Sequence, residues 1–184
     1  MTAIQSPPII HPPDPRRLED EAGIELVNGN VVEKPVSIES SEIEATIQRL
    51  LGNEAVKARD ARVFGSSMGY RCFPDEPARF RKPDGSLVRA DRLANVNPQD
   101  GFMPIPADLV VEVLSPNDLA YDVQEKVEDY LAHGFPLIWV VHPNTRSVMI
   151  YRATGAPSLL HHEDEITGEA ALPTFRCKVA AFFE

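Results

Sequence analysis

The sequence predicts an α/β or α+β fold in which helices pack on a β-sheet. Patterns typical of a hairpin, a helix, strands, a second helix and further strands follow one another along the chain. Residues 108–141 predict a strand, a helix and a strand, which together indicate one right-handed crossover unit. The 184 residues are 43% hydrophobic and 25% charged, the ordinary balance of a folded domain.

The chain is expected to consist of an arm and one domain. Residues 1–20 contain prolines at positions 7, 8, 12, 13 and 15, which remove backbone donors and fix φ. We therefore expect a flexible, Pro-rich arm there. Residues 21–184 are long enough for one domain with its own core and short for two.

A hairpin and a helix are predicted first. Apolar and polar residues alternate over residues 24–33 on both sides of Asn28-Gly29, a pair that favours the positive φ of a type I′ turn. The pattern from Ser41 to Glu44 is typical of a capping box and predicts a helix over 41–57. Its buried stripe is expected to contain Ile43, Ile47, Leu50 and Leu51.

Short strands are predicted next, at residues 62–64, 70–73 and 87–88. Residues 91–105 are rich in Asn, Gly and Pro and predict a loop. Residues 108–114 form a nearly continuous apolar run, which is typical of a strand covered on both faces.

A second helix is predicted over residues 118–133, ending at Gly134. Its buried stripe is expected to contain Leu119, Val123, Val127 and Leu131, while Asp122, Lys126 and Tyr130 form a separate line four residues apart. Strands are expected at 137–141 and 147–152, and a short apolar segment at 175–183 closes the chain.

Cysteine content and hydropathy bear on the compartment. Cys72 and Cys177 lie far apart and have no metal-ligand partner at short spacing, so neither a disulfide framework nor a zinc site is indicated. No apolar run approaches the length of a membrane span. A cytoplasmic protein without a membrane partner is expected.

The net charge of −10 argues against a chain that coats nucleic acid, because neutralising phosphates requires clustered Lys and Arg. A cleft with a locally basic rim is still compatible with it. The basic residues that gather in one region are Arg79, Arg81, Lys82, Arg89 and Arg92. This group is expected to be a solvated hairpin or part of such a rim.

Two acids lie in or beside the most apolar segment, and a buried charge needs a partner or a metal. Asp108 and Glu112 share one face of the predicted strand but are roughly 13 Å apart, too far to hold one ion alone. Asp84, beside the apolar pair Leu87-Val88, is expected on a neighbouring strand. Asp84 and Glu112 are the preferred pair for Mg²⁺ or Mn²⁺, which suits phosphodiester hydrolysis, with Lys126 near the attacking water.

A structural role for the same residues is an open alternative. Asp108 would cap a strand, Glu112 would pair with Lys126, and Asp84 would begin an Asp-Gly turn. Phosphoesters smaller than DNA are also open as substrates of this ion chemistry, because they need no basic track.

Several linked motifs resemble the Uma-two family of restriction-type endonucleases, a branch of the PD-(D/E)XK nuclease superfamily. The similar stretches are 24–29, 81–84, 106–116, the line from Asp122 through Lys126 to Tyr130, Gly134, 139–141 and 172–175. The resemblance implies a restriction-endonuclease-like mixed sheet with flanking helices, Mg²⁺-dependent DNA cleavage and a homodimer. It implies metal-binding roles for Asp84, Asp108 and Glu112 and an accessory role for Glu25.

The chain departs from the superfamily pattern at one important position. The superfamily lysine follows the strand acid by two residues, where this chain has Leu114. Its role is therefore assigned to Lys126 on the next helix. The competing hypothesis, favoured by this departure and by the net charge, is a non-catalytic dimeric interaction or regulatory protein on a nuclease scaffold.

Overall fold

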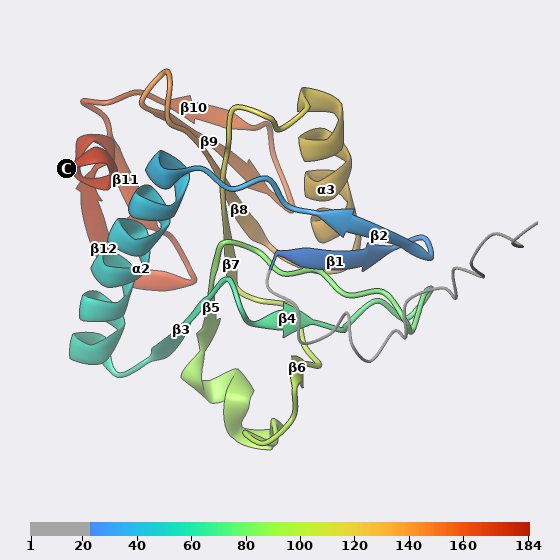
Figure 1. The fold of residues 1–184 in the computed structure, drawn as a ribbon. Helices are drawn as coiled ribbons and strands as arrows, with labels where there is room; N and C mark the ends of the chain where they lie inside the picture. Colours follow the sequence, from blue (N-terminus) through green and yellow to red (C-terminus); the bar gives the residue numbers. More distant parts are fainter. Residues whose placement is uncertain (1–22) are drawn as a thin grey trace, which may run out of the picture.

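A computed structural model describes residues 23–184, so the predicted arm at residues 1–20 lies outside the described residues. The centre of the fold is a six-stranded mixed sheet in the order β10-β9-β8-β7-β5-β3 (Figure 1). Its strands are β3 (Ala61–Gly65), β5 (Gly85–Arg89), β7 (Leu109–Val113), β8 (Leu137–His142), β9 (Ser147–Arg152) and β10 (Ser158–Leu160). β7 and β8 are parallel and all other neighbours are antiparallel.

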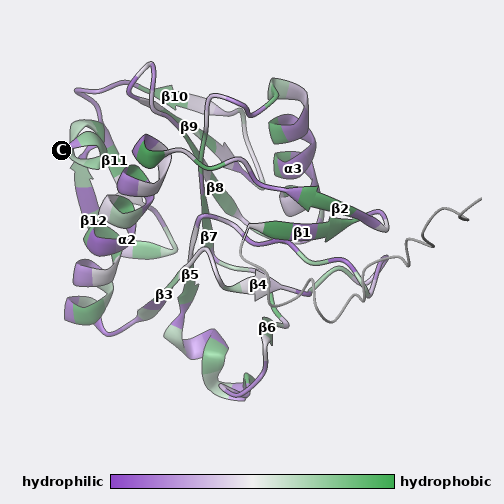
Figure 2. Ribbon diagram, in the orientation of Figure 1, coloured by the Kyte–Doolittle hydropathy of each residue, from purple (hydrophilic) through white to green (hydrophobic). Residues whose placement is uncertain are grey.

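The α-helices of the described residues cover opposite faces of this sheet. Alternate residues of each strand point to opposite faces. Leu109, Val111 and Val113 of β7 pack in the cluster that includes α2 (Ile38–Ala58), whereas Val110 packs in the cluster that includes α3 (Ala120–Ala132). Both helices carry hydrophobic and hydrophilic stretches in alternation (Figure 2). The mixed α+β fold predicted from the sequence is thus observed.

The predicted hairpin is confirmed. β1 (Ile24–Val27) and β2 (Asn30–Glu33) pair antiparallel. Asn28 and Gly29 both have positive φ, 51° and 72°, as a type I′ turn requires. A bridge between Leu26 and Phe80 attaches the hairpin to the segment before β5, and Figure 1 shows it beside α3.

The start predicted for the first helix was wrong. α2 begins at Ile38, and its capping box is formed by Ser37 and Ser40 instead of Ser41 and Glu44. A contact between the hydroxyls of Ser40 and Ser115, 3.1 Å apart, ties this earlier cap to the end of β7. Of the two possible capping boxes, the observed one is therefore the one that also makes a contact with a distant part of the chain.

The burial predicted for the second helix was partly wrong. Leu119 precedes the helix as its N-cap and is 64% exposed, whereas Tyr130, placed outside the apolar stripe, is fully buried. Val127 is buried as expected. Gly134, with a φ of 84°, follows the end of the helix.

Several short elements were missed. Residues 91–105 are not a plain loop, since they include most of the 3-10 helix η1 (Ala90–Asn95) and the strand β6 (Phe102–Met103), which pairs with β4 (Gly69–Tyr70). The strand predicted at 70–73 is shorter and begins earlier than expected. The C-terminal region forms β11 (Glu165–Gly168), β12 (Leu172–Lys178) and the 3-10 helix η2 (Val179–Phe183), which packs near α2.

Among residues 23–184, no helix combines the length and the apolar character that a bilayer span needs.

Candidate functional site

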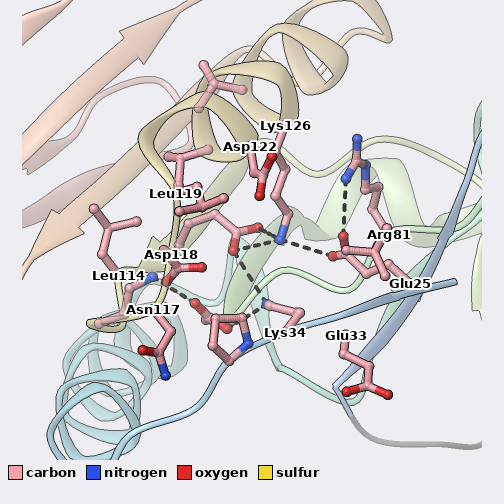
Figure 3. Close-up of a pocket in the computed structure, with 17 residues that line it drawn as sticks. Glu25, Glu33, Lys34, Arg81, Leu114, Asn117, Asp118, Leu119, Asp122 and Lys126 are labelled. Atoms are coloured by element: carbon pink, nitrogen blue, oxygen red, sulfur yellow. Dashed lines mark hydrogen bonds and ion pairs between the residues drawn. The ribbon is translucent and has the colours of Figure 1, made fainter.

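A small cleft lies where the hairpin, the C-terminal end of β7 and α3 meet. It measures about 220 Å³. Its charged and polar lining residues are Glu25, Glu33, Lys34, Arg81, Asp84, Glu112, Asn117, Asp118, Asp122 and Lys126. In Figure 3, Lys34 and Lys126 approach the centre of this group from opposite sides, Arg81 reaches Glu25, and Glu33 points away. Segments that are distant in the sequence thus converge on one hollow.

The structure brings Asp84 and Glu112 together across neighbouring strands. Asp84 lies directly before β5, and its Oδ2 accepts a hydrogen bond from the backbone N–H of Val113 at 2.7 Å. The other oxygen of Asp84 lies 2.6 Å from Lys34 Nζ, and Glu112 Oε2 lies 3.4 Å from the same nitrogen. Asp84 and Glu112, the pair expected from strand geometry, therefore both contact the Lys34 ammonium.

Glu112 is buried at the end of β7 and is held by two groups of α3. Lys126 Nζ lies 2.9 Å from its carboxylate, and the Tyr130 hydroxyl donates to Oε1 at 2.9 Å. Burial raises the pKa of the Glu112 carboxyl above its usual range, although Lys126 and Lys34 oppose the shift. Burial also keeps the pKa of Tyr130 well above its ordinary value, so its hydroxyl stays protonated and donates.

Glu25 is the most deeply buried acid of the cluster, with 1% exposure. It accepts hydrogen bonds from the backbone N–H of Lys82 at 2.8 Å and from Arg81 at 3.2 Å, and Lys126 Nζ lies 3.0 Å away. Burial alone would raise the pKa of Glu25. The positive charges of Lys126, Lys34 and Arg81 outweigh that effect and lower this pKa to about 2.

The structure does not bring Asp108 into this group. Its carboxylate lies 2.8 Å from Arg92 and accepts the backbone N–H of Arg89 at 2.8 Å, and it is not among the residues that line the cleft. Strand alternation put Asp108 on the same face as Glu112, but at the opposite end of β7. The structural alternative considered for Asp108 describes its observed contacts.

Lys34 was missed by sequence reasoning. Its N–H donates to the carbonyl of Gly23 at 2.8 Å, which continues the hairpin ladder and aims the side chain at the cleft. Burial would lower the pKa of Lys34, but Glu112 and Asp84 outweigh it and raise that pKa above its usual value. The available signal was the pairing register of the hairpin, in which the residue after Glu33 lies beside Gly23.

The basic cluster does not form a solvated hairpin throughout. Arg79, Arg81 and Lys82 are buried. Arg79 and Arg81 both bind Asp129 of α3, the latter with an Nη2–Oδ2 distance of 2.8 Å. These charges stabilise the interior beneath the cleft, while Glu33, Asp118 and Asp122 contribute negative charge to its lining.

The oxygen donors of the cleft fit a divalent cation of the Mg²⁺ type. Asp84 and Glu112 share one cation position, and Mg²⁺ uses one or two carboxylates and keeps several waters. Within residues 23–184 no three His, Cys, Asp or Glu side chains form a complete metal cage. A cation here would therefore depend on the two carboxylates, water and a bound phosphate.

Comparisons with known proteins bear on the family and the fold of the chain. A family model described as "Putative restriction endonuclease", Uma2, matches residues 13–180. The chain belongs to this family. No curated protein matches it.

The fold of this Uma2 family member also resembles a crystal structure described as a "putative nuclease belonging to DUF820" from Anabaena variabilis. The TM-score is 0.76 at 20% identity, and the match covers 87% of this chain and 89% of the other. The restriction-endonuclease-like mixed sheet implied by the sequence is confirmed.

Proposed function

We propose that this chain is a divalent-metal-dependent endonuclease that hydrolyses phosphodiester bonds in DNA. The observation that carries the proposal is the convergence of Asp84, Glu112 and Lys126 on one cleft. The family description and the fold support a nuclease. A homodimer and a cytoplasmic location stay predictions.

Each charged residue of the cleft would have a distinct role in the proposed reaction. Asp84 and Glu112 would hold Mg²⁺ or Mn²⁺, which supplies Lewis-acid polarisation of the phosphate and acidification of a water. Lys126 would orient the attacking water or stabilise the negative charge that develops on the phosphate oxygens. Tyr130 fixes the carboxylate of Glu112, and Glu25 fixes the ammonium of Lys126.

The size of the cleft matches a reaction at a phosphate. Cavities that enclose drug-sized molecules are about 300–1,000 Å³. The cleft, at about 220 Å³, is smaller than these cavities, so a phosphate group with its ion would enter it while the bases stay outside. Recognition of a DNA strand would then depend on surfaces beside the cleft.

A non-catalytic interaction protein is the second candidate. It is favoured by the pairing of Glu25, Asp84 and Glu112 with cationic side chains, which leaves the cluster balanced without a metal. The net charge of −10 also works against binding DNA. This candidate predicts a folded protein that neither binds Mn²⁺ nor cleaves DNA.

Nicking of supercoiled plasmid separates the two candidates. The wild-type protein is expected to nick DNA with Mg²⁺ or Mn²⁺, and Glu112→Gln and Asp84→Asn are expected to lose about 100-fold or more of the rate. Glu165→Gln, at the exposed first residue of β11, removes the same charge outside the cleft and should match wild type. Equal rates in wild type and both cleft variants, all folded by circular dichroism, would refute the proposal.

A further inference from the structure

The ammonium of Lys34 occupies the position between the two proposed metal ligands. Its Nζ lies 2.6 Å from Asp84 Oδ1, 3.4 Å from Glu112 Oε2 and 2.8 Å from the carbonyl oxygen of Lys82. Three hard oxygen atoms therefore surround one positive charge. Carboxylate and carbonyl oxygens are also the ligands that divalent cations of the Mg²⁺ and Ca²⁺ type prefer.

Lys34 supplies part of the positive charge in a cleft whose lining is otherwise rich in acidic side chains. The buried Glu25 and Glu112 and the partly buried Asp84 face three cations, Lys34, Lys126 and Arg81. A divalent cation at the Asp84–Glu112 position would lie close to the Lys34 ammonium and compete for the same oxygens. Like charges at such short range repel strongly in a partly buried site.

Lys34 also borders a second hollow. This hollow measures about 500 Å³ and is also lined by Asp84. Glu33, Glu44 and Ser66 also line this second hollow and offer oxygen acceptors. Because a lysine side chain has a long flexible stem, the ammonium can move between the two hollows while the hairpin backbone stays in place.

We propose that Lys34 is a built-in competitor of the metal. Its ammonium closes the Asp84–Glu112 site when divalent cations are scarce and moves to the second hollow when one binds. The inference rests on the proposed metal-dependent function and adds a control on it. Metal concentration, and not only substrate, would then set how much of the protein is active.

Titration calorimetry with MnCl₂ tests the competition. Lys34→Met keeps most of the aliphatic stem and removes the charge, so the Kd for Mn²⁺ should fall by about tenfold or more relative to wild type. Lys34→Arg keeps the charge and should not gain affinity. Lys57→Met is the matched control, because Lys57 on α2 is 72% exposed and lies outside both hollows.

Each result of the titration decides a different point. Tighter Mn²⁺ binding in Lys34→Met alone supports the inference. Equal or weaker binding than wild type would refute it while leaving the metal-dependent nuclease intact. If neither protein binds Mn²⁺ at millimolar concentration, both the competition and the metal-dependent function fail.

Chemical labelling of the wild-type chain tests the movement without any variant. Lys34 and Lys126 have equal side-chain exposure, 14%, so both should be methylated slowly by formaldehyde and a borane reductant. Saturating Mg²⁺ should speed methylation of Lys34 several-fold while Lys126 stays protected, as followed by mass spectrometry. Unchanged protection of Lys34 with Mg²⁺ would overturn the proposed movement.

Discussion

On the α2 side of the central sheet the buried layer is almost wholly apolar, whereas on the α3 side it is interrupted by charge. On the α2 side, Trp139 packs against Phe175 and Phe182. Across the sheet, the buried Glu112 and Glu25 pair with the partly buried Lys126. Moving a charge out of water costs several kcal/mol, and pairing recovers this only where geometry and hydrogen bonding are good. The difference indicates that the α2 side mainly contributes stability, whereas the α3 side is less favourable for stability because it contains the charged cleft.

The largest loss of stability should come from the apolar face. Trp139 is fully buried, so Trp139→Ala should lower the free energy of unfolding by about 3–5 kcal/mol through lost burial and a cavity. Urea titration measures this change. Because Trp139 lies away from the cleft, the Kd of the folded variant for Mn²⁺ should equal that of wild type. A changed Kd at equal foldedness would show that the two faces are not independent.

A comparable loss with a different pH dependence is expected on the charged face. The pKa of Glu25 is about 2 in the folded chain, below the roughly 4.3 of an unfolded glutamate. Its stabilising contribution is therefore complete above pH 5 and declines as the pH falls toward 2, since the unfolded state takes up the proton first. Glu25→Gln should cost about 3 kcal/mol at pH 7.

The pH series gives this second prediction its control. The difference in unfolding free energy between wild type and Glu25→Gln should shrink as the pH is lowered from 6 to 3. Trp139→Ala should show no such convergence, because its loss involves no ionisable group. A difference for Glu25→Gln that stays constant with pH would contradict the charge network described for this residue.

The smallest effect concerns the contact between Tyr130 and Glu112. Tyr130→Phe removes one hydrogen bond to a buried carboxylate and should cost about 2 kcal/mol or less. Tyr121→Phe, on the same helix and 76% exposed, should change stability by less than about 0.5 kcal/mol. If Tyr130 only supports the sheet, Tyr130→Phe will retain the nicking rate; a positioning role predicts a slower rate at full metal saturation.

Local signals in the sequence were sufficient for much of the fold. The Asn28-Gly29 pair specified its turn because these two residue types themselves favour positive φ, without help from distant contacts. Local signals did not determine where the first helix begins, because Ser37 and Ser41 both begin plausible capping boxes. The observed box, which begins at Ser37, is the one whose Ser40 contacts the distant Ser115. The burial of Tyr130 likewise could not be predicted locally, because its hydroxyl donates to Glu112 on the neighbouring strand β7.

The site was predictable to the extent that strand geometry determined it. Asp84 and Glu112 were brought together by adjacent strands, and Lys126 by the helix that follows β7. Asp108 was assigned to the site by the family resemblance, whereas its carboxylate lies against Arg92 and outside the cleft, as the distance along the strand indicated. The hairpin register indicated that Lys34 lies beside Gly23, but its approach to the cleft also depends on how the hairpin docks at Phe80. The catalytic roles of these residues stay predictions.

The pairing of β1 with β2 has a consequence for how the chain avoids misfolding. A slip of one residue along a strand turns every side chain to the opposite face. In this hairpin such a slip would turn Glu25 outward and leave Arg81 and Lys126 without one of their carboxylates. An uncompensated buried cation is costly. The charges beneath the hairpin therefore penalise the wrong alignment of a short, two-stranded element whose apolar contacts alone would discriminate weakly.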